Sequence, residues 1–231
     1  MEGFDRAWER YERLMEERPE LFVQSKELMI ITDKEQVRRF ADEHDRLFGV
    51  VYESAYSLLV VDLVESGGVR FAYERSVPAS KGAIVSVPMY EGKYVLVKQY
   101  RHALRGWQIN FPRGFGEQGI SAEDNLRKEI MEELGAEVSD PEKIGSVYPD
   151  SGISSGAVDY FSCQISEPKL KAGYEGIREL ILLTEEELID GIRSGAIDDG
   201  FTLTAWALLK ARKKQPCTDS LRNNKAAREN A

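Results

Sequence analysis

The chain contains few of the residues on which nucleophilic enzymes and disulfide-rich proteins depend. Its 231 residues include only two histidines, His44 and His102, and two cysteines, Cys163 and Cys217. The cysteines are far apart and lack Cys-x-x-Cys spacing, which disfavours both a disulfide framework and a zinc cluster. No nucleophilic serine or cysteine arrangement emerges around either histidine. The sequence therefore disfavours serine-hydrolase chemistry and predicts a reducing compartment, the cytoplasm.

Long apolar runs and an excess of basic charge are also absent. No apolar stretch reaches the roughly 20 residues that a membrane-spanning helix needs, and the N-terminal segment MEGFDRAWERYERLMEERPEL is densely charged. The 31 basic and 40 acidic residues give a formal net charge of −9, whereas a protein that binds nucleic-acid phosphates normally has a basic stripe. We therefore expect no membrane partner and no nucleic-acid partner. The acidic balance is compatible with a small-molecule enzyme that recruits divalent cations.

The N-terminal residues have helical periodicity. Residues 3–17 place apolar side chains at helical spacing, and a second helix is predicted over 33–47. Thr32 and Glu35 have the spacing of a capping box at the start of the second helix. These two segments predict an N-terminal helical appendage over residues 1–47.

From residue 48 the periodicity becomes that of strands. Four β-branched and aromatic segments come before residue 113, and Glu91-Gly92 separates two of them as in a hairpin. Three more strand candidates follow, and then two helices over 185–194 and 200–213. This order predicts an α+β fold, a mixed sheet packed between helices. We expect the domain to span 48–214 and to be followed by a polar tail over 215–231 with little fixed structure.

The stretch RGFGEQGISAEDNLRKEIMEELGAEV, residues 113–138, has three interpretations. It formally contains Gly-x-Gly-x-x-Gly, the pattern of a dinucleotide loop. However, the preceding segment carries polar residues and a proline, the helix starts only at Ser121, and no second βαβ unit follows. The second interpretation, a solvated acidic helix face, is the common role of glutamates on a helix.

The third interpretation is a hard-metal site. At about 100° per residue, Glu129 and Glu133 fall at the edge of an apolar stripe, and Glu132 lies beyond Glu129. Three carboxylates beside a buried face need positive compensation, and oxygen ligands of this kind suit Mg²⁺. The glycine turn adds a backbone carbonyl that can approach closely. An ion held there can neutralise and orient a diphosphate. The apolar stripe consists of Ala122, Leu126, Ile130 and Leu134.

In its order of residues this stretch resembles the Nudix box, whose pattern is GX5EX7REUXEEXGU with U a bulky aliphatic residue. The spacing from Gly114 to the basic position, the glutamates and the terminal glycine all agree. Two positions depart from the pattern, since Ile120 replaces the early glutamate and Lys128 replaces the arginine. The resemblance implies a Nudix hydrolase with an α/β/α sandwich that uses Mg²⁺ or Mn²⁺ to cleave nucleoside diphosphates linked to another moiety. Lysine cannot reproduce the forked geometry of arginine, so the departures bear on metal affinity and catalytic efficiency.

The likeness extends upstream, where VKQYR and GWQINFPRG resemble the ADP-ribose pyrophosphatase branch. By this resemblance Arg75, Arg101 and Arg113 bind substrate, and Glu175, in a loop between two strand candidates, is the expected general base. Arg113 stands where the family has a small alanine, and its carbonyl is an expected metal ligand. The implied metal and catalytic set is Arg113, Gly114, Glu129, Glu132 and Glu133.

The expected reaction is attack of water on one phosphorus of an ADP-ribose-like nucleoside diphosphate sugar, giving AMP and a sugar phosphate. Two alternatives stay open: an enzyme for another nucleotide sugar, and a weakly active protein that binds ADP-ribose as a sensor. The acidic N-terminal helices offer no basic helix-turn-helix region for a transcriptional sensor. Because relatives in this branch commonly pair through N-terminal segments, the resemblance also implies a homodimer.

Overall fold

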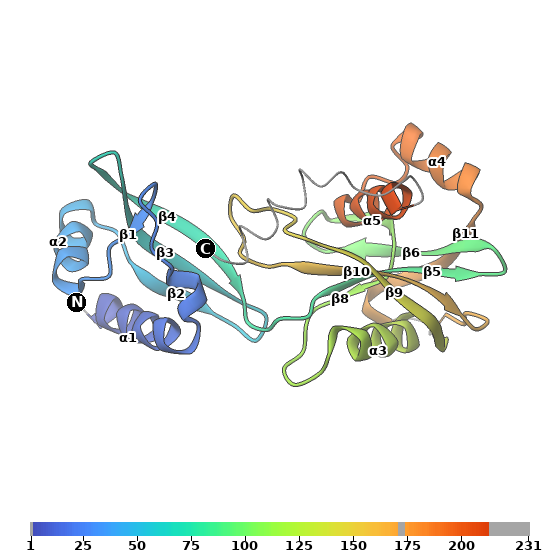
Figure 1. Ribbon diagram of the computed structural model, residues 1–231, viewed down its shortest axis with the longest axis horizontal. Helices are drawn as coiled ribbons and strands as arrows, with labels where there is room; N and C mark the ends of the chain where they lie inside the picture. Colours follow the sequence, from blue (N-terminus) through green and yellow to red (C-terminus); the bar gives the residue numbers. More distant parts are fainter. Residues whose placement is uncertain (1, 171–173, 213–231) are drawn as a thin grey trace. The chain divides into compact units, whose positions relative to one another are not determined.

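The computed structural model describes residues 2–170 and 174–212, so the predicted tail over 215–231 lies outside the described residues. The chain divides into two compact units (Figure 1). The first contains Met1–Ala83, Phe115–Gly119 and Val147–Val158, and the second contains Ile84–Gly114, Ile120–Ser146 and the chain from Asp159 onward.

The first unit is an α+β unit and not only a pair of helices. The strand β3 pairs antiparallel with β1, β2 and β4, and β4 follows it along its whole length. The predicted domain boundary at residue 48 therefore falls inside this unit, because the strands that follow residue 48 pair with one another and pack with the N-terminal helices. Its elements are α1 Glu2–Glu17, η1 Pro19–Phe22, β1 Met29–Ile30, α2 Lys34–His44, β2 Gly49–Glu53, β3 Ser57–Ser66 and β4 Val69–Pro78.

The core of the first unit explains why α1 forms. Phe4, Trp8, Tyr11 and Leu14 are buried, and their spacing of three or four residues places them on one helix face. The predicted capping box at Thr32 is wrong by one residue. The side chain of Asp33 caps α2 instead, accepting a hydrogen bond from the Gln36 N–H at 2.9 Å.

The second unit is built on a mixed sheet in the order β11-β6-β5-β10-β9, with β7 beside β6 and β8 beside β5. β10 runs parallel to β5, whereas β6, β7, β8 and β11 pair antiparallel with their neighbours. Its elements are β5 Ile84–Tyr90, β6 Lys93–Arg101, β7 Gly106–Asn110, β8 Arg113–Gly114, α3 Ala122–Leu134, β9 Val138–Val147, β10 Val158–Ile165, η2 Tyr174–Gly176, β11 Ile177–Leu183, α4 Glu185–Ser194 and α5 Gly200–Arg212.

Helices cover both faces of this sheet, with α3 on one side and α5 on the other (Figure 1). The predicted α/β/α sandwich with a mixed sheet is therefore confirmed. The hairpin predicted at Glu91-Gly92 joins β5 to β6, and both residues have positive φ angles, 48° and 75°. Positive φ at both central residues is typical of the type I′ turn that matches strand twist.

No helix in the described part of the chain is both long and apolar enough to cross a membrane.

Candidate active site

The helix α3 is fixed at both ends and along one face. Ser121 caps its start, where the Ser121 hydroxyl accepts a hydrogen bond from the Asp124 N–H at 3.0 Å. Gly135 ends it with a φ of 58°, and a Cβ at this position would lie 2.7 Å from the Lys169 carbonyl oxygen. The predicted apolar stripe is buried, since Leu126, Ile130 and Leu134 are fully covered. The rotation of the helix is thereby set, and with it the direction of its glutamates.

Two of the predicted glutamates, Glu129 and Glu133, are buried, at 9% and 1% exposure. The Oε2 atom of Glu133 is buried and has no hydrogen-bond partner among the described residues. Burial raises the pKa of Glu133 to about 8, and the negative charges of Glu129 and Glu175 add to the rise. Arg101 and Arg113 oppose it. The structure thus brings the other four predicted residues within electrostatic reach of Glu133, and a cation bound there would offset the negative charge.

Gly114 lies directly against the Glu129 carboxylate. An added Cβ on Gly114 would stand 2.0 Å from Glu129 Oε1. The strand that carries Gly114, β8, is held by β5, where Gly114 pairs with Ile84. The structure therefore places the predicted glycine beside the predicted metal-binding glutamate, with no side chain between them.

Glu132, the third predicted glutamate, is half-buried and forms an ion pair with Lys128. Its Oε2 lies 3.7 Å from Nζ of Lys128, one helical turn away. The lysine that departs from the family pattern thus pairs with a glutamate of its own helix, at the i, i+4 spacing that brings side chains together.

The two arginines of the cluster come from β6 and β8, which both pair with β5. Arg101 ends β6, and its Nε and Nη2 atoms are buried without a hydrogen-bond partner among the described residues. Burial lowers the pKa of Arg101, as does the nearby charge of Arg113. Arg113 donates from Nη1 to Asp199 Oδ1 at 3.0 Å, and its guanidinium lies 4.3 Å from the centre of the Phe201 ring.

Asp199 is a site residue that the sequence analysis missed. It stands directly before α5 and is 4% exposed. Its carboxylate accepts a hydrogen bond from the Thr202 N–H at 2.9 Å, the contact of a helix N-cap. The spacing Asp199-x-x-Thr202 was the available signal, although it gives no hint of the partner Arg113.

Glu175 and Arg75, the remaining predicted residues, lie in different units. Glu175 is exposed in η2 with a φ of 43°, and its carbonyl accepts a hydrogen bond from Gln99 Nε2 at 3.0 Å. Arg75 lies in the first unit, where it donates to Asp62 Oδ2 at 2.6 Å and to the Leu21 carbonyl at 2.8 Å. These contacts give Arg75 a structural role inside its own unit.

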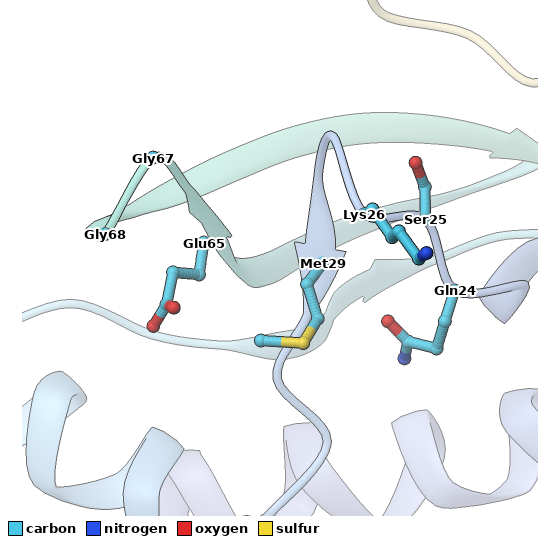
Figure 2. Close-up of a pocket in the computed structure, with 7 residues that line it drawn as sticks. All are labelled: Gln24, Ser25, Lys26, Met29, Glu65, Gly67 and Gly68. Carbon is cyan, nitrogen blue, oxygen red and sulfur yellow. The ribbon is translucent and has the colours of Figure 1, made fainter.

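A cavity of about 440 Å³ lies in the first unit. Met29 stands between Glu65 and Gln24 in its lining (Figure 2). None of the predicted site residues lines this cavity, and the clustered charges described above lie in the second unit. The complete lining is Gln24, Ser25, Lys26, Met29, Glu65, Gly67 and Gly68.

The donors around α3 fit a hard divalent cation in their chemistry. Among the described residues, no group of three or more His, Cys, Asp or Glu side chains stands ready-made around one point. The unpartnered buried Oε2 of Glu133 and the neighbouring carboxylate of Glu129 nevertheless supply oxygen atoms, which Mg²⁺ prefers. Positive charge at this position would also offset the repulsion between the two carboxylates.

The second unit combines an α/β/α sandwich with buried glutamates on the helix that follows a glycine-bearing strand, as the resemblance to the Nudix box implies. Residues 80–188 match the family model for the NUDIX domain. Over these residues, the resemblance to the Nudix hydrolases seen in the sequence is confirmed.

Two curated relatives and one solved structure are similar to the chain. The ADP compounds hydrolase NudE of Escherichia coli (strain K12) is 31% identical over 80 residues, which are 35% of this chain and 43% of that protein. The ADP-ribose pyrophosphatase of Bacillus subtilis (strain 168) is 25% identical over 146 residues, 62% of this chain and 79% of that protein. A crystal structure of an ADP compounds hydrolase has a TM-score of 0.60 at 18% identity, covering 70% of this chain and 89% of that one, and supports the fold. The match thus spans less than half the length of NudE.

Proposed function

We propose that the protein hydrolyses the diphosphate of ADP-ribose or a related nucleoside diphosphate sugar to a nucleoside monophosphate and a sugar phosphate. One observation carries this proposal. The buried Glu133 on α3 lies within electrostatic reach of two arginines of the same unit, Arg101 at the end of β6 and Arg113 in β8. Carboxylates that attract a cation and arginines that attract an anion are together what a metal-bound diphosphate requires. The two curated relatives, which are named for ADP compounds and ADP-ribose, support this substrate class.

The metal would be held by Glu129, Glu132 and Glu133 and by the backbone carbonyls of Arg113 and Gly114. Mg²⁺ or Mn²⁺ bound there supplies charge neutralisation of the phosphate oxygens and lowers the pKa of a bound water.

Arg101 is the principal anion-binding residue. Its buried Nε and Nη2 atoms have no hydrogen-bond partner among the described residues, so a phosphate that binds them displaces no existing protein contact. Guanidinium groups present their donors in a planar fork that matches phosphate oxygens. Together with Arg113, this side chain orients the diphosphate and stabilises the charge that develops on it during phosphoryl transfer.

Glu175 acts as the general base. Two observations support this role: the negative charge of Glu175 contributes to the raised pKa of Glu133, and the Glu175 side chain is exposed. It takes the proton from the water that attacks phosphorus, the phosphoanhydride bond breaks, and the nucleoside monophosphate leaves. We give Arg75 no part in these steps, because Asp62 and Leu21 already occupy its donors.

A substrate panel tests the proposal. The purified protein is incubated in Mg²⁺ with ADP-ribose, NADH, ADP-glucose, GDP-mannose and a nucleoside triphosphate, and the phosphate-containing products are identified. We expect AMP from ADP-ribose, abolished by Glu133→Gln and unaffected by Glu137→Gln, an exposed glutamate four residues further along. Equal AMP release by wild type and Glu133→Gln would contradict the site assignment.

The second candidate is a protein that binds ADP-ribose without cleaving it. The replacement of the family's arginine by Lys128, which pairs with Glu132, favours this alternative. Titration of labelled ADP-ribose with and without Mg²⁺ separates the two, since saturable binding with no product in Mg²⁺ would support the binding protein. The homodimer and the cytoplasmic location stay predictions, of which the first is tested by mass measurement in solution.

A further inference from the structure

The buried carboxylate of Asp199 accepts hydrogen bonds from two residues, Thr202 and Arg113. Its Oδ2 accepts hydrogen bonds from the Thr202 N–H at 2.9 Å and from the Thr202 hydroxyl at 2.8 Å. Its Oδ1 accepts from Arg113 Nη1 at 3.0 Å. Because both of these donors belong to Thr202 in the first turn of α5, the orientation of the carboxylate is fixed independently of Arg113. Its remaining oxygen is thereby presented to the guanidinium.

The same network reaches the backbone that leads into β8. The Phe111 N–H donates to the Thr202 hydroxyl oxygen at 2.9 Å, while that hydroxyl donates its proton to Asp199. Phe111, Thr202 and Asp199 are all at most 4% exposed, so water competes little for these bonds. The start of α5 therefore anchors both the approach to β8 and the Arg113 side chain.

Arg113 needs such an anchor because its neighbour carries the same charge. Arg101 and Arg113 repel, and the charge of Asp199 opposes the effect of that repulsion on Arg101. The Phe201 ring supports the guanidinium from α5 at 4.3 Å, a cation–π distance. Asp199 and Phe201 together hold Arg113 close to Arg101, and both of these contacts are made with Arg113.

We propose that Asp199 is a positioning residue that holds the Arg113 guanidinium in place for an anionic substrate. It does not touch the substrate and acts through Arg113. The identification of the anion as a diphosphate rests on the proposed function, whereas the positioning of Arg113 stands on the hydrogen bonds of Asp199.

A double-mutant cycle tests this role. The affinity for ADP-ribose is measured by calorimetry in EDTA, so that nothing is cleaved, for wild type, Asp199→Asn, Arg113→Gln and the double variant. Each single variant is expected to lose about tenfold in affinity, the scale of one charge-assisted hydrogen bond. If Asp199 acts through Arg113, the double variant loses no more than Arg113→Gln alone. Independent losses that multiply to about 100-fold, or wild-type affinity in Asp199→Asn, would overturn the proposal.

The matched control is Asp190→Asn, the same substitution in an exposed ion pair with Arg193 on α4; its affinity is expected to stay at the wild-type value. Nitrogen NMR of arginine side chains gives a readout independent of binding. The Arg113 Nη signals are expected to be separate in the wild type, because a held guanidinium rotates slowly. A freely rotating Arg113 in the wild type would overturn the proposal even if Asp199→Asn does not fold.

Turnover in Mg²⁺ is measured on the same variants. Slow Arg113 rotation or coupled binding losses without product formation would refute the hydrolase and leave the positioning intact. Product formation, together with affinity losses of the two single variants that multiply in the double variant, would support the hydrolase and refute the positioning role of Asp199.

Discussion

The contact between Gly114 and Glu129 gives a sharp test of the site geometry through Gly114→Ala. The new Cβ would lie 2.0, 2.1 and 2.5 Å from Oε1, Cδ and Cγ of Glu129, whereas ordinary contacts begin at 3.4 Å. β8 cannot yield easily, because β5 pairs with it and the Ser86 N–H and hydroxyl hold the adjacent Pro112 carbonyl at 2.9 and 3.0 Å. The carboxylate of Glu129 must therefore move by more than an ångström.

A displacement of this size has a predictable cost. Misplacing a catalytic group by about 1 Å lowers turnover by about 100-fold, while overpacking of this kind costs about 1–3 kcal/mol of stability. We therefore expect Gly114→Ala to fold and to lose about 100-fold in AMP release from ADP-ribose in Mg²⁺. The measurements are the initial rate at saturating substrate and the free energy of unfolding in urea.

Gly106→Ala is the matched control for this experiment. Gly106 begins β7 in the same sheet, and its added Cβ would meet only the Leu104 carbonyl oxygen, at 3.8 Å. Its turnover is expected to stay within about twofold of the wild type. If Gly114→Ala turns over as fast as Gly106→Ala, Glu129 has no positional role and the reasoning fails.

Three further predictions concern other parts of the chain. Asp62→Ala removes the buried partner of Arg75 and should lower the free energy of unfolding in urea by about 3–5 kcal/mol. The control Glu74→Ala removes an exposed ion pair and should lower it by less than about 1 kcal/mol. Equal losses in the two variants would contradict the structural role of Arg75. Burial raises the pKa of Cys163 to about 12, so peptide mass spectrometry should find this thiol unmodified by iodoacetamide at pH 8 in native protein and modified in urea. Glu175→Gln should lower turnover by about 100-fold or more, as loss of a general base does, and full turnover would remove Glu175 from the mechanism.

The sequence predicted the second unit's fold because the signals there are local. The hairpin at Glu91-Gly92 needs only two residues that accept positive φ. The burial of Glu129 and Glu133 follows from the 100° step of a helix and the stripe beside them, since one buried face fixes every other direction on the same helix.

Tertiary structure decided which distant groups meet. Asp199 and Arg113 are 86 residues apart, and only the packing of α5 against β5, the strand with which β8 pairs, brings them together. The predicted boundary at residue 48 differs from the observed division for the same reason, because strand periodicity does not tell to which sheet a strand belongs. Likewise, the sequence places Arg75 on a strand and does not show its partner. Only the pairing of β4 with β3 shows that Arg75 donates a hydrogen bond to Asp62. The directions of side chains along one helix are set by its backbone geometry. Contacts between strands and helices depend instead on the order and register of the strands in the sheet.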